Sequence, residues 1–258
     1  MTFSSTTDSD VSPGLSTIPL VWMYHSIAPY DEDPFEVTMT PQRFESQMRW
    51  LQRRGLQGVS MAELLREKAQ GRARRMVGLT FDDGYQDFIT NALPVLQRYG
   101  YTATLFVLAG RLGGRNEWSR PGPDKALLTA SQLREIDGAG MEIGSHGLEH
   151  ISLVKADDAA LTAEAARSRL ILQQLLDKEI AGFCYPYGYL DARVVEASKA
   201  AGYDYACAVT PSSSIGRHAI PRTLVHEGDT SWRLDAKRIV STLTVGNRLG
   251  VRRYRGDQ

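Results

Sequence analysis

Two carboxylates stand side by side in the stretch Thr80–Tyr85, which reads Thr-Phe-Asp-Asp-Gly-Tyr. The apolar run at 76–79 before them is typical of a buried strand, and Gly84 marks the place where that strand ends. Because α/β folds carry their chemistry where parallel strands end, we expect Asp82 and Asp83 to lie at such an edge.

A second motif, Ser145–His150, holds two histidines four residues apart. On a helical turn this spacing places both imidazoles on one side, an arrangement that often binds a transition metal. Together with one aspartate of the first motif, the histidines make three protein ligands and leave coordination positions for water and substrate. The other aspartate remains available as a base. Each motif is common by itself, but their occurrence together at the ends of predicted strands indicates a metal site.

The composition fits one large domain rather than a nucleic-acid-binding or membrane protein. Of the 258 residues 42% are hydrophobic, which is enough for a substantial core. Thirty basic and thirty acidic residues give a formal net charge of zero, so nucleic acid is not an expected partner. No apolar run approaches the ~20 residues of a membrane span. The first ten residues lack the features of a secretory signal, which favours a cytoplasmic location.

The chain divides into a central domain and two tails. Residues 1–16 are rich in Ser, Thr, Asp and Gly, and we expect them to be disordered. The catalytic domain is expected at 17–247, and a basic tail at 248–258 carries arginines that could contact anionic lipid. The two cysteines, Cys184 and Cys207, are too few for a disulfide framework and are expected to be buried thiols.

Strand and helix patterns alternate along the domain, which predicts a parallel sheet or barrel of about seven strands. The predicted strands lie at 18–24, 75–81, 102–108, 141–145, 182–186, 205–209 and 220–226. The predicted helices begin after the capping residues Thr40 and Ser60 and continue at 86–99, 131–139, 157–177, 191–201 and 231–243. Pro94 argues that the helix at 86–99 is irregular or starts late.

These motifs give the chain a resemblance to the polysaccharide deacetylase family, the NodB-homology domains of carbohydrate esterase family 4. The matching segments, in the family's order, are Thr80–Tyr85, Ser145–His150, Tyr185–Gly188 and Leu224–His226. The opening Trp22–Ile27 is similar to the branch that modifies exopolysaccharides. The resemblance covers roughly residues 18–245 and implies a distorted (β/α) barrel with fewer than eight strand–helix units, in agreement with the seven predicted strands.

The resemblance also implies roles for the site residues. It makes Asp83, His146 and His150 the ligands of one divalent metal and Asp82 the general base. Two imidazoles and one carboxylate suit zinc, with cobalt, nickel or manganese as alternatives. It further implies that the backbone N–H of Tyr187 stabilises the oxyanion, and His226 matches the acid that protonates the leaving nitrogen.

One position departs from the family pattern. Many members carry an arginine two residues before the proline of Pro-Tyr-Gly, where it pairs with the catalytic base, but Cys184 occupies that position here. Arg222 on the last predicted strand is the best candidate for a replacement cation, although a surface position for it is an equal alternative. Without such a cation the pKa of Asp82 would rise.

Several further residues are expected at the substrate. His25 ends the first predicted strand and could orient Asp82, contact the substrate or pack. Trp118 lies in a long Gly/Pro-rich loop and could stack on a sugar ring or close the barrel as a core residue. We also expect substrate contacts from Tyr85 and Tyr187.

The expected function is that of a metal-dependent hydrolase that removes N-acetyl groups from an amino sugar. The substrate could be a glycan, a lipid-linked sugar or a small glycoside. Two alternative reactions remain open, hydrolysis of cyclic ureides or imides on the same fold and cleavage of O-acetyl esters. A non-catalytic glycan-binding module is the alternative from another class, but a binding site has no need of a base beside its metal.

Overall fold

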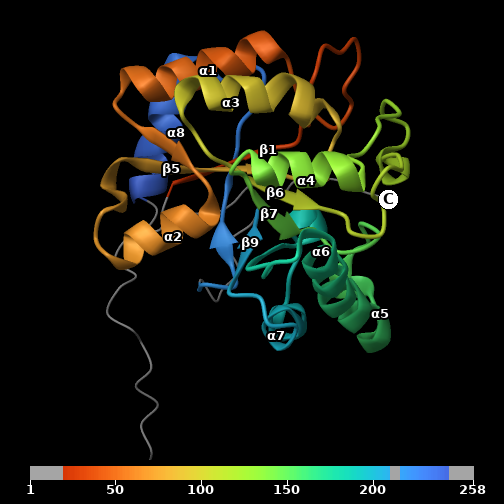
Figure 1. Cartoon of the computed structure of the whole chain (residues 1–258). Helices are drawn as coiled ribbons and strands as arrows, with labels where there is room; N and C mark the ends of the chain where they lie inside the picture. Colours follow the sequence, from red (N-terminus) through yellow and green to blue (C-terminus); the bar gives the residue numbers. More distant parts are fainter. Residues whose placement is uncertain (1–19, 210–215, 244–258) are drawn as a thin grey trace, which may run out of the picture.

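The computed structural model describes residues 20–209 and 216–243 (Figure 1). The tails predicted at 1–16 and 248–258 lie outside these residues, so their predicted disorder and lipid contact stay predictions. Figure 1 shows the strands at the centre of the molecule and the helices around them.

A parallel sheet forms the centre of the fold, and its strands follow the order β10-β9-β8-β7-β6-β5-β1-β11. Their bounds are β1 Val21–Tyr24, β5 Met76–Phe81, β6 Thr104–Val107, β7 Glu142–Ser145, β8 Gly182–Cys184, β9 Tyr205–Ala208, β10 Ile220–Pro221 and β11 Thr223–Leu224. The additional strand β4, Gln57–Val59, pairs with β5. A separate pair is formed by β2, Ser26–Ile27, and β3, Thr38–Met39.

The barrel is nearly closed by the segment predicted as one strand at 220–226. This segment consists of two short strands separated by Arg222. β10 pairs with β9 at one end of the sheet, and β11 pairs with β1 at the other. The two outermost strands are therefore consecutive in the chain. The predicted distorted (β/α) barrel is confirmed, with eight strands along the sheet because the seventh predicted strand is split.

Each predicted helix is present among the described residues. The bounds are α1 Pro41–Arg53, α2 Met61–Ala69, α3 Leu93–Tyr99, α4 Ala130–Gly138, α5 Asp158–Thr162, α6 Ser168–Leu176, α7 Ala192–Ala200 and α8 Ser231–Leu243. The Thr40 and Ser60 side chains cap α1 and α2 by accepting hydrogen bonds from backbone N–H groups.

Two helices depart from regular α-helical geometry. A π-helical turn at Phe88–Ala92 precedes α3, and Pro94 lies in the first turn of α3, where its missing N–H costs nothing. A second π-helical turn, Ala163–Arg167, interrupts the helix predicted at 157–177 and separates α5 from α6. Such turns recur at functional sites.

Aromatic packing fixes the strand that carries the two carboxylates. Phe81, the last residue of β5, stacks on Tyr24 of β1 with ring centroids 5.1 Å apart and meets Phe88 edge-on at 4.9 Å. All three rings are buried. The chain therefore leaves β5 in a defined direction at Asp82.

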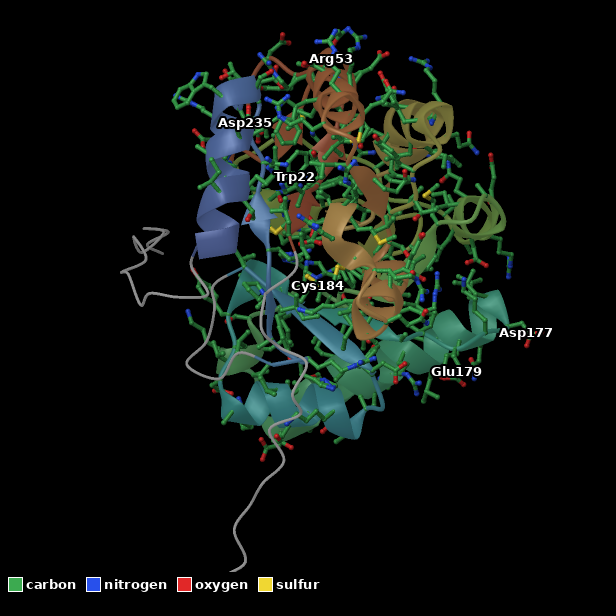
Figure 2. The ribbon with its side chains drawn as sticks, turned by 90° about the vertical axis from the view of Figure 1, so that its left-hand side faces the viewer. Trp22, Arg53, Asp177, Glu179, Cys184 and Asp235 are labelled. Atoms are coloured by element: carbon green, nitrogen blue, oxygen red, sulfur yellow. The ribbon has the colours of Figure 1, made fainter. Side chains whose placement is uncertain are left out.

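The two cysteines lie opposite one another on neighbouring strands, Cys184 on β8 and Cys207 on β9. Both are buried free thiols, as expected. Figure 2 shows Cys184 and Trp22 inside the molecule, whereas Asp177, Glu179 and Asp235 lie at its periphery. In the described part of the chain, no helix combines the length and apolar character needed to cross a bilayer.

Candidate active site

Asp82 and Asp83 follow β5 directly, and the backbone between them sends their side chains to different partners. The N–H of Asp82 donates to Tyr24 O at 3.0 Å and so extends the pairing with β1 by one residue. Asp83 then adopts φ 71°, a left-handed conformation that reverses the chain direction. Both carboxylates are buried, with exposures of 3% and 5%.

Asp82 is held by Arg222, the residue between β10 and β11. Arg222 Nη1 donates to Asp82 Oδ1 at 2.6 Å, and Nη2 donates to Oδ2 at 2.7 Å. Burial alone would raise the pKa of Asp82, but the charge and hydrogen bonds of Arg222 outweigh it and lower that pKa. Arg222 is thus a buried cation beside Asp82 and not a surface residue.

The Arg222 guanidinium has two further partners. It donates to Thr80 Oγ1 at 3.0 Å and to Cys184 Sγ at 2.9 Å. Thr80 begins the first motif, but its contact with Arg222 was not predicted. The sequence could have indicated this contact, because side chains two residues apart on a strand, such as those of Thr80 and Asp82, lie on the same face.

Asp83 faces the two histidines of the second motif. His146 Nε2 lies 3.4 Å and His150 Nε2 lies 3.2 Å from Asp83 Oδ1. Burial opposes ionisation of Asp83, but the two imidazoles hold its pKa well below the usual value. His146 Nδ1 lies 2.8 Å from Cys184 O, so Nδ1–H donates to that carbonyl and the lone pair of Nε2 points toward Asp83.

These three residues fit a divalent metal. Their potential ligand atoms all lie within 4.8 Å of one another. Asp83 Oδ1 and His150 Nδ1 are buried without a hydrogen-bond partner, although buried polar atoms are normally paired. A carboxylate oxygen that faces two imidazole nitrogens but has no hydrogen bond is the environment that a cation would complete.

The potential ligand atoms of a second group, Asp82, His146 and Cys184, also lie within 4.8 Å of one another. Arg222 occupies both carboxylate oxygens of Asp82 and also contacts the Cys184 thiol. A buried guanidinium at this position repels a second cation. The group of Asp83, His146 and His150 is therefore the better metal site.

Backbone strain concentrates at these residues. Among the described residues, the positive-φ positions other than glycine are Glu36, Asp83, His150, Asp177 and Tyr187. Three of these five are predicted site residues. Such conformations cost energy and persist where the surrounding structure imposes them, which is frequent at active sites.

Aromatic rings flank His150. The Trp118 ring stacks on it with centroids 4.7 Å apart and an interplanar angle of 19°, and the Tyr187 ring meets it at 4.5 Å and 69°. Tyr187 is 48% exposed and stacks further on Tyr189, which is 46% exposed. Trp118 thus packs on a candidate metal ligand and is itself half-buried.

Tyr85 lies beneath the loop that follows β6. It forms an isolated bridge with Leu127, and Lys125 Nζ lies 5.6 Å from its ring centroid. Burial and the charge of Asp83 raise the pKa of Tyr85. Tyr85 is 2% exposed, and its predicted contact with the substrate stays a prediction.

The two other predicted histidines follow neighbouring strands. His25 comes after β1, and its Nε2 lies 4.0 Å from Asp82 Oδ2. His226 comes shortly after β11, where its N–H donates to Asp229 Oδ2 at 2.8 Å and its Nδ1 lies 3.8 Å from Glu36 Oε2. Burial lowers the pKa of both imidazoles. The structure therefore brings His25, rather than His226, next to the predicted base.

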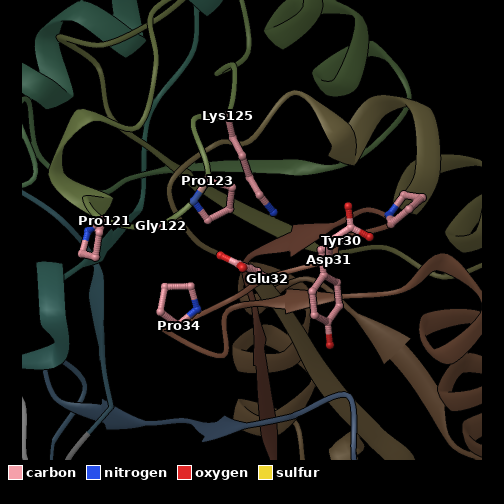
Figure 3. A pocket seen from close by; sticks show the side chains of 9 residues that line it. Tyr30, Asp31, Glu32, Pro34, Pro121, Gly122, Pro123 and Lys125 are labelled. Atoms are coloured by element: carbon pink, nitrogen blue, oxygen red, sulfur yellow. The ribbon is translucent and has the colours of Figure 1, made fainter.

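Two surface cavities lie beside the loop that carries Trp118. The larger, of about 480 Å³, lies between the segments 29–34 and 121–125, with Lys125 on one side and Pro34 on the other (Figure 3). The smaller, of about 390 Å³, is lined by residues of the segment 116–124. Neither cavity includes a residue of the metal-ligand group, although Asn116 and Glu117, which line the smaller one, lie next to Trp118 in the chain.

Residues 69–206 match the polysaccharide deacetylase family, and the chain belongs to this family. A putative polysaccharide deacetylase of Bacillus subtilis, YxkH, is 27% identical over 213 residues, which cover 81% of this chain and 71% of the relative. A poly-β-1,6-N-acetyl-D-glucosamine N-deacetylase of Staphylococcus aureus is 28% identical over 205 residues, covering 74% and 68%.

Solved structures show the same fold. The Streptococcus pyogenes deacetylase PplD in complex with acetate superimposes with a TM-score of 0.72 at 24% identity, covering 85% of this chain and 97% of that one. IcaB from Ammonifex degensii gives 0.68 at 20% identity, covering 86% and 97%. The family resemblance inferred from the motifs is confirmed, and family membership implies an acetylated sugar as substrate.

Proposed function

We propose that this chain is a metal-dependent N-deacetylase of a polymer of N-acetylglucosamine. The observation that carries the proposal is that two adjacent carboxylates have different partners. Asp83 faces two imidazoles, whereas Asp82 is bound by Arg222. The relative from Staphylococcus aureus, by its name, acts on a β-1,6-linked polymer of this sugar, which supports that linkage for the substrate here.

An amide resists hydrolysis because its carbonyl is weakly electrophilic and its amine anion leaves poorly. A divalent ion held by Asp83, His146 and His150, zinc first, would polarise the acetyl carbonyl and lower the pKa of the attacking water. The rest of the chemistry falls to side chains and backbone groups of the chain itself.

Asp82 would take the proton from the attacking water. Arg222 keeps this carboxylate ionised to low pH and fixes its plane through two hydrogen bonds. Each carboxylate oxygen keeps a further acceptor position, so Asp82 can bind Arg222 and still accept the proton.

Two groups would act after the water attacks, one on the oxyanion and one on the leaving nitrogen. The backbone N–H of Tyr187 is our candidate donor to the oxyanion. His226 is our candidate acid for the leaving nitrogen, with His25 as the runner-up because it lies nearer to Asp82. Since burial and then Lys237 lower the pKa of His226, its imidazole must be protonated within the reaction before it can act as an acid.

The direct test is acetate release by the zinc-loaded protein from β-1,6-linked N-acetylglucosamine oligomers. Oligomers with β-1,4 linkage, an O-acetylated sugar and a cyclic imide would serve as competing substrates, and the Asp82→Asn variant as the blank. Acetate from the β-1,6 oligomers that depends on Asp82 would support the proposal. Turnover of the imide or the ester alone would assign the site to one of the other reactions, and glycan binding without any turnover would indicate a binding module.

A further inference from the structure

The turn that joins the two histidine ligands is held by two side chains, that of Ser145 within the motif and that of Glu164 from outside it. The N–H of Gly147 donates to Ser145 Oγ at 3.1 Å. The next two N–H groups, of Leu148 and Glu149, both donate to Glu164 Oε2, at 2.6 and 3.3 Å. Three successive backbone donors of this turn therefore point at side-chain oxygens, two of them at one carboxylate.

Glu164 is an unusual residue to find in this position. It lies in the π-helical turn between α5 and α6 and is 4% exposed, yet no lysine or arginine of the described residues forms an ion pair with it. By contrast, the carboxylate of Asp158, in the same helical arm, is exposed and paired with Arg193. A buried carboxylate is costly unless it is hydrogen-bonded, and here the ligand turn supplies the hydrogen bonds.

The fit between Glu164 and the turn is close. A Cβ atom placed on Gly147 would lie 2.5 Å from Glu164 Oε2, well inside contact distance. Gly147 also has φ 88°, which a side chain would strain. The carboxylate thus fills the space beside His146 that a side chain at the next position would otherwise occupy.

We propose that Glu164 is a positioning residue for the metal site, which holds the 147–149 turn so that the imidazoles of His146 and His150 converge on Asp83. The inference rests on the metal site of the proposed function. Asp82 and Arg222 compensate one another, which leaves Asp83 as the carboxylate that faces the two imidazoles. Groups that orient the ligands of a metal from outside its coordination shell commonly tune the affinity of the site.

The test compares Glu164→Met, which keeps the volume but removes the acceptor, with Glu164→Gln, which keeps an uncharged acceptor. Asp158→Asn is the matched control, since it removes an exposed carboxylate from the same helical arm. Zinc affinity would be measured by competition with a chelator, and the geometry of the site from the visible absorption of the cobalt-loaded protein. We expect a zinc affinity about 10–100-fold weaker in Glu164→Met, a smaller loss in Glu164→Gln, and none in the control.

A second readout needs no metal. In the metal-free protein, the Leu148 amide should exchange its hydrogen much faster in Glu164→Met than in the wild type, because its acceptor is gone. Unchanged zinc affinity and cobalt spectrum in folded Glu164→Met would overturn the inference. If that variant does not fold, Glu164→Ala takes its place, and a zinc affinity equal to that of the wild type would overturn the inference. A wild-type protein that binds no metal would instead refute the metal site itself.

Discussion

Arg222 and Asp82 are joined by two parallel hydrogen bonds, at 2.6 and 2.7 Å, across 140 residues of sequence. The cation comes from the barrel's closing segment and lies against Cys184, the position where many relatives carry an arginine. The positive charge that is absent at position 184 is therefore still present beside Asp82, but it comes from a different strand.

Removing this cation should shift the pH dependence of activity. Asp82 must be ionised to act as a base, so kcat/KM falls as the pH drops through its pKa. Arg222 lowers that pKa, and Arg222→Met should therefore raise it and move the acidic limb to higher pH. Arg222→Lys keeps a charge without the planar fork and should move the limb less, while Cys184→Ser should leave it in place. The measurement is a pH–rate profile of each variant, and an unmoved limb in Arg222→Met would show that Asp82 does not depend on this cation.

Replacing Asp82 and replacing Asp83 should have different effects on metal binding and turnover. Asp82→Asn should keep the metal but lose turnover by about 10²–10⁴-fold, because the base is gone while the ligands remain. Asp83→Asn should lose metal as well as turnover. Metal content and acetate release would be measured on the same preparations. Near-normal turnover of metal-loaded Asp82→Asn would contradict this division of roles.

The metal site should depend on His146. The wild-type protein should bind about one divalent ion per chain, and His146→Ala should bind none, because two remaining ligands hold such an ion poorly. Elemental analysis after dialysis checks both. Full occupancy in His146→Ala would rule out this ligand set.

His226 and His25 can be told apart by the leaving group. An amine needs a proton in order to leave, whereas the phenolate of a nitrophenyl acetate does not. Replacing the acid residue by alanine should therefore lower the rate of amide hydrolysis strongly and the rate of ester hydrolysis only slightly. We expect this split for His226→Ala and equal losses for His25→Ala. The reverse result would assign the acid role to His25.

Trp118 should report on metal binding through its contact with His150. Its ring stacks on the ligand at 4.7 Å, so a paramagnetic ion such as cobalt should quench its fluorescence. Replacement by phenylalanine should remove the quenching, while replacement of Trp232, which is exposed on α8, should not. Quenching that persists in Trp118→Phe would mean that another tryptophan lies nearer to the ion.

The parts of the molecule that local sequence determines were predictable. The capping residue Thr40 predicted the start of α1, Pro94 predicted the irregular helix, and the apolar runs predicted most of the strands. The grouping of one aspartate with the two histidines followed because strand ends of a parallel barrel meet at one edge, and the family resemblance implied that this aspartate is Asp83.

What could not be predicted depends on pairings between distant segments. The break at Arg222 arises because β10 and β11 pair with different neighbours, which no local pattern records. The stacking of Trp118 on His150 and the burial of Tyr85 depend on how a long loop folds back over the barrel. Glu164 gave no signal, since a glutamate in a helical pattern normally faces solvent.

The nearly closed barrel has a consequence for the order in which the site is assembled. All three proposed metal ligands precede residue 151 in the chain, whereas Arg222 lies between the last two strands, which also join the two ends of the sheet. A nascent or truncated chain can therefore present the histidines before the base acquires its cation. Full activity and closure of the fold would then appear in the same step, late in synthesis.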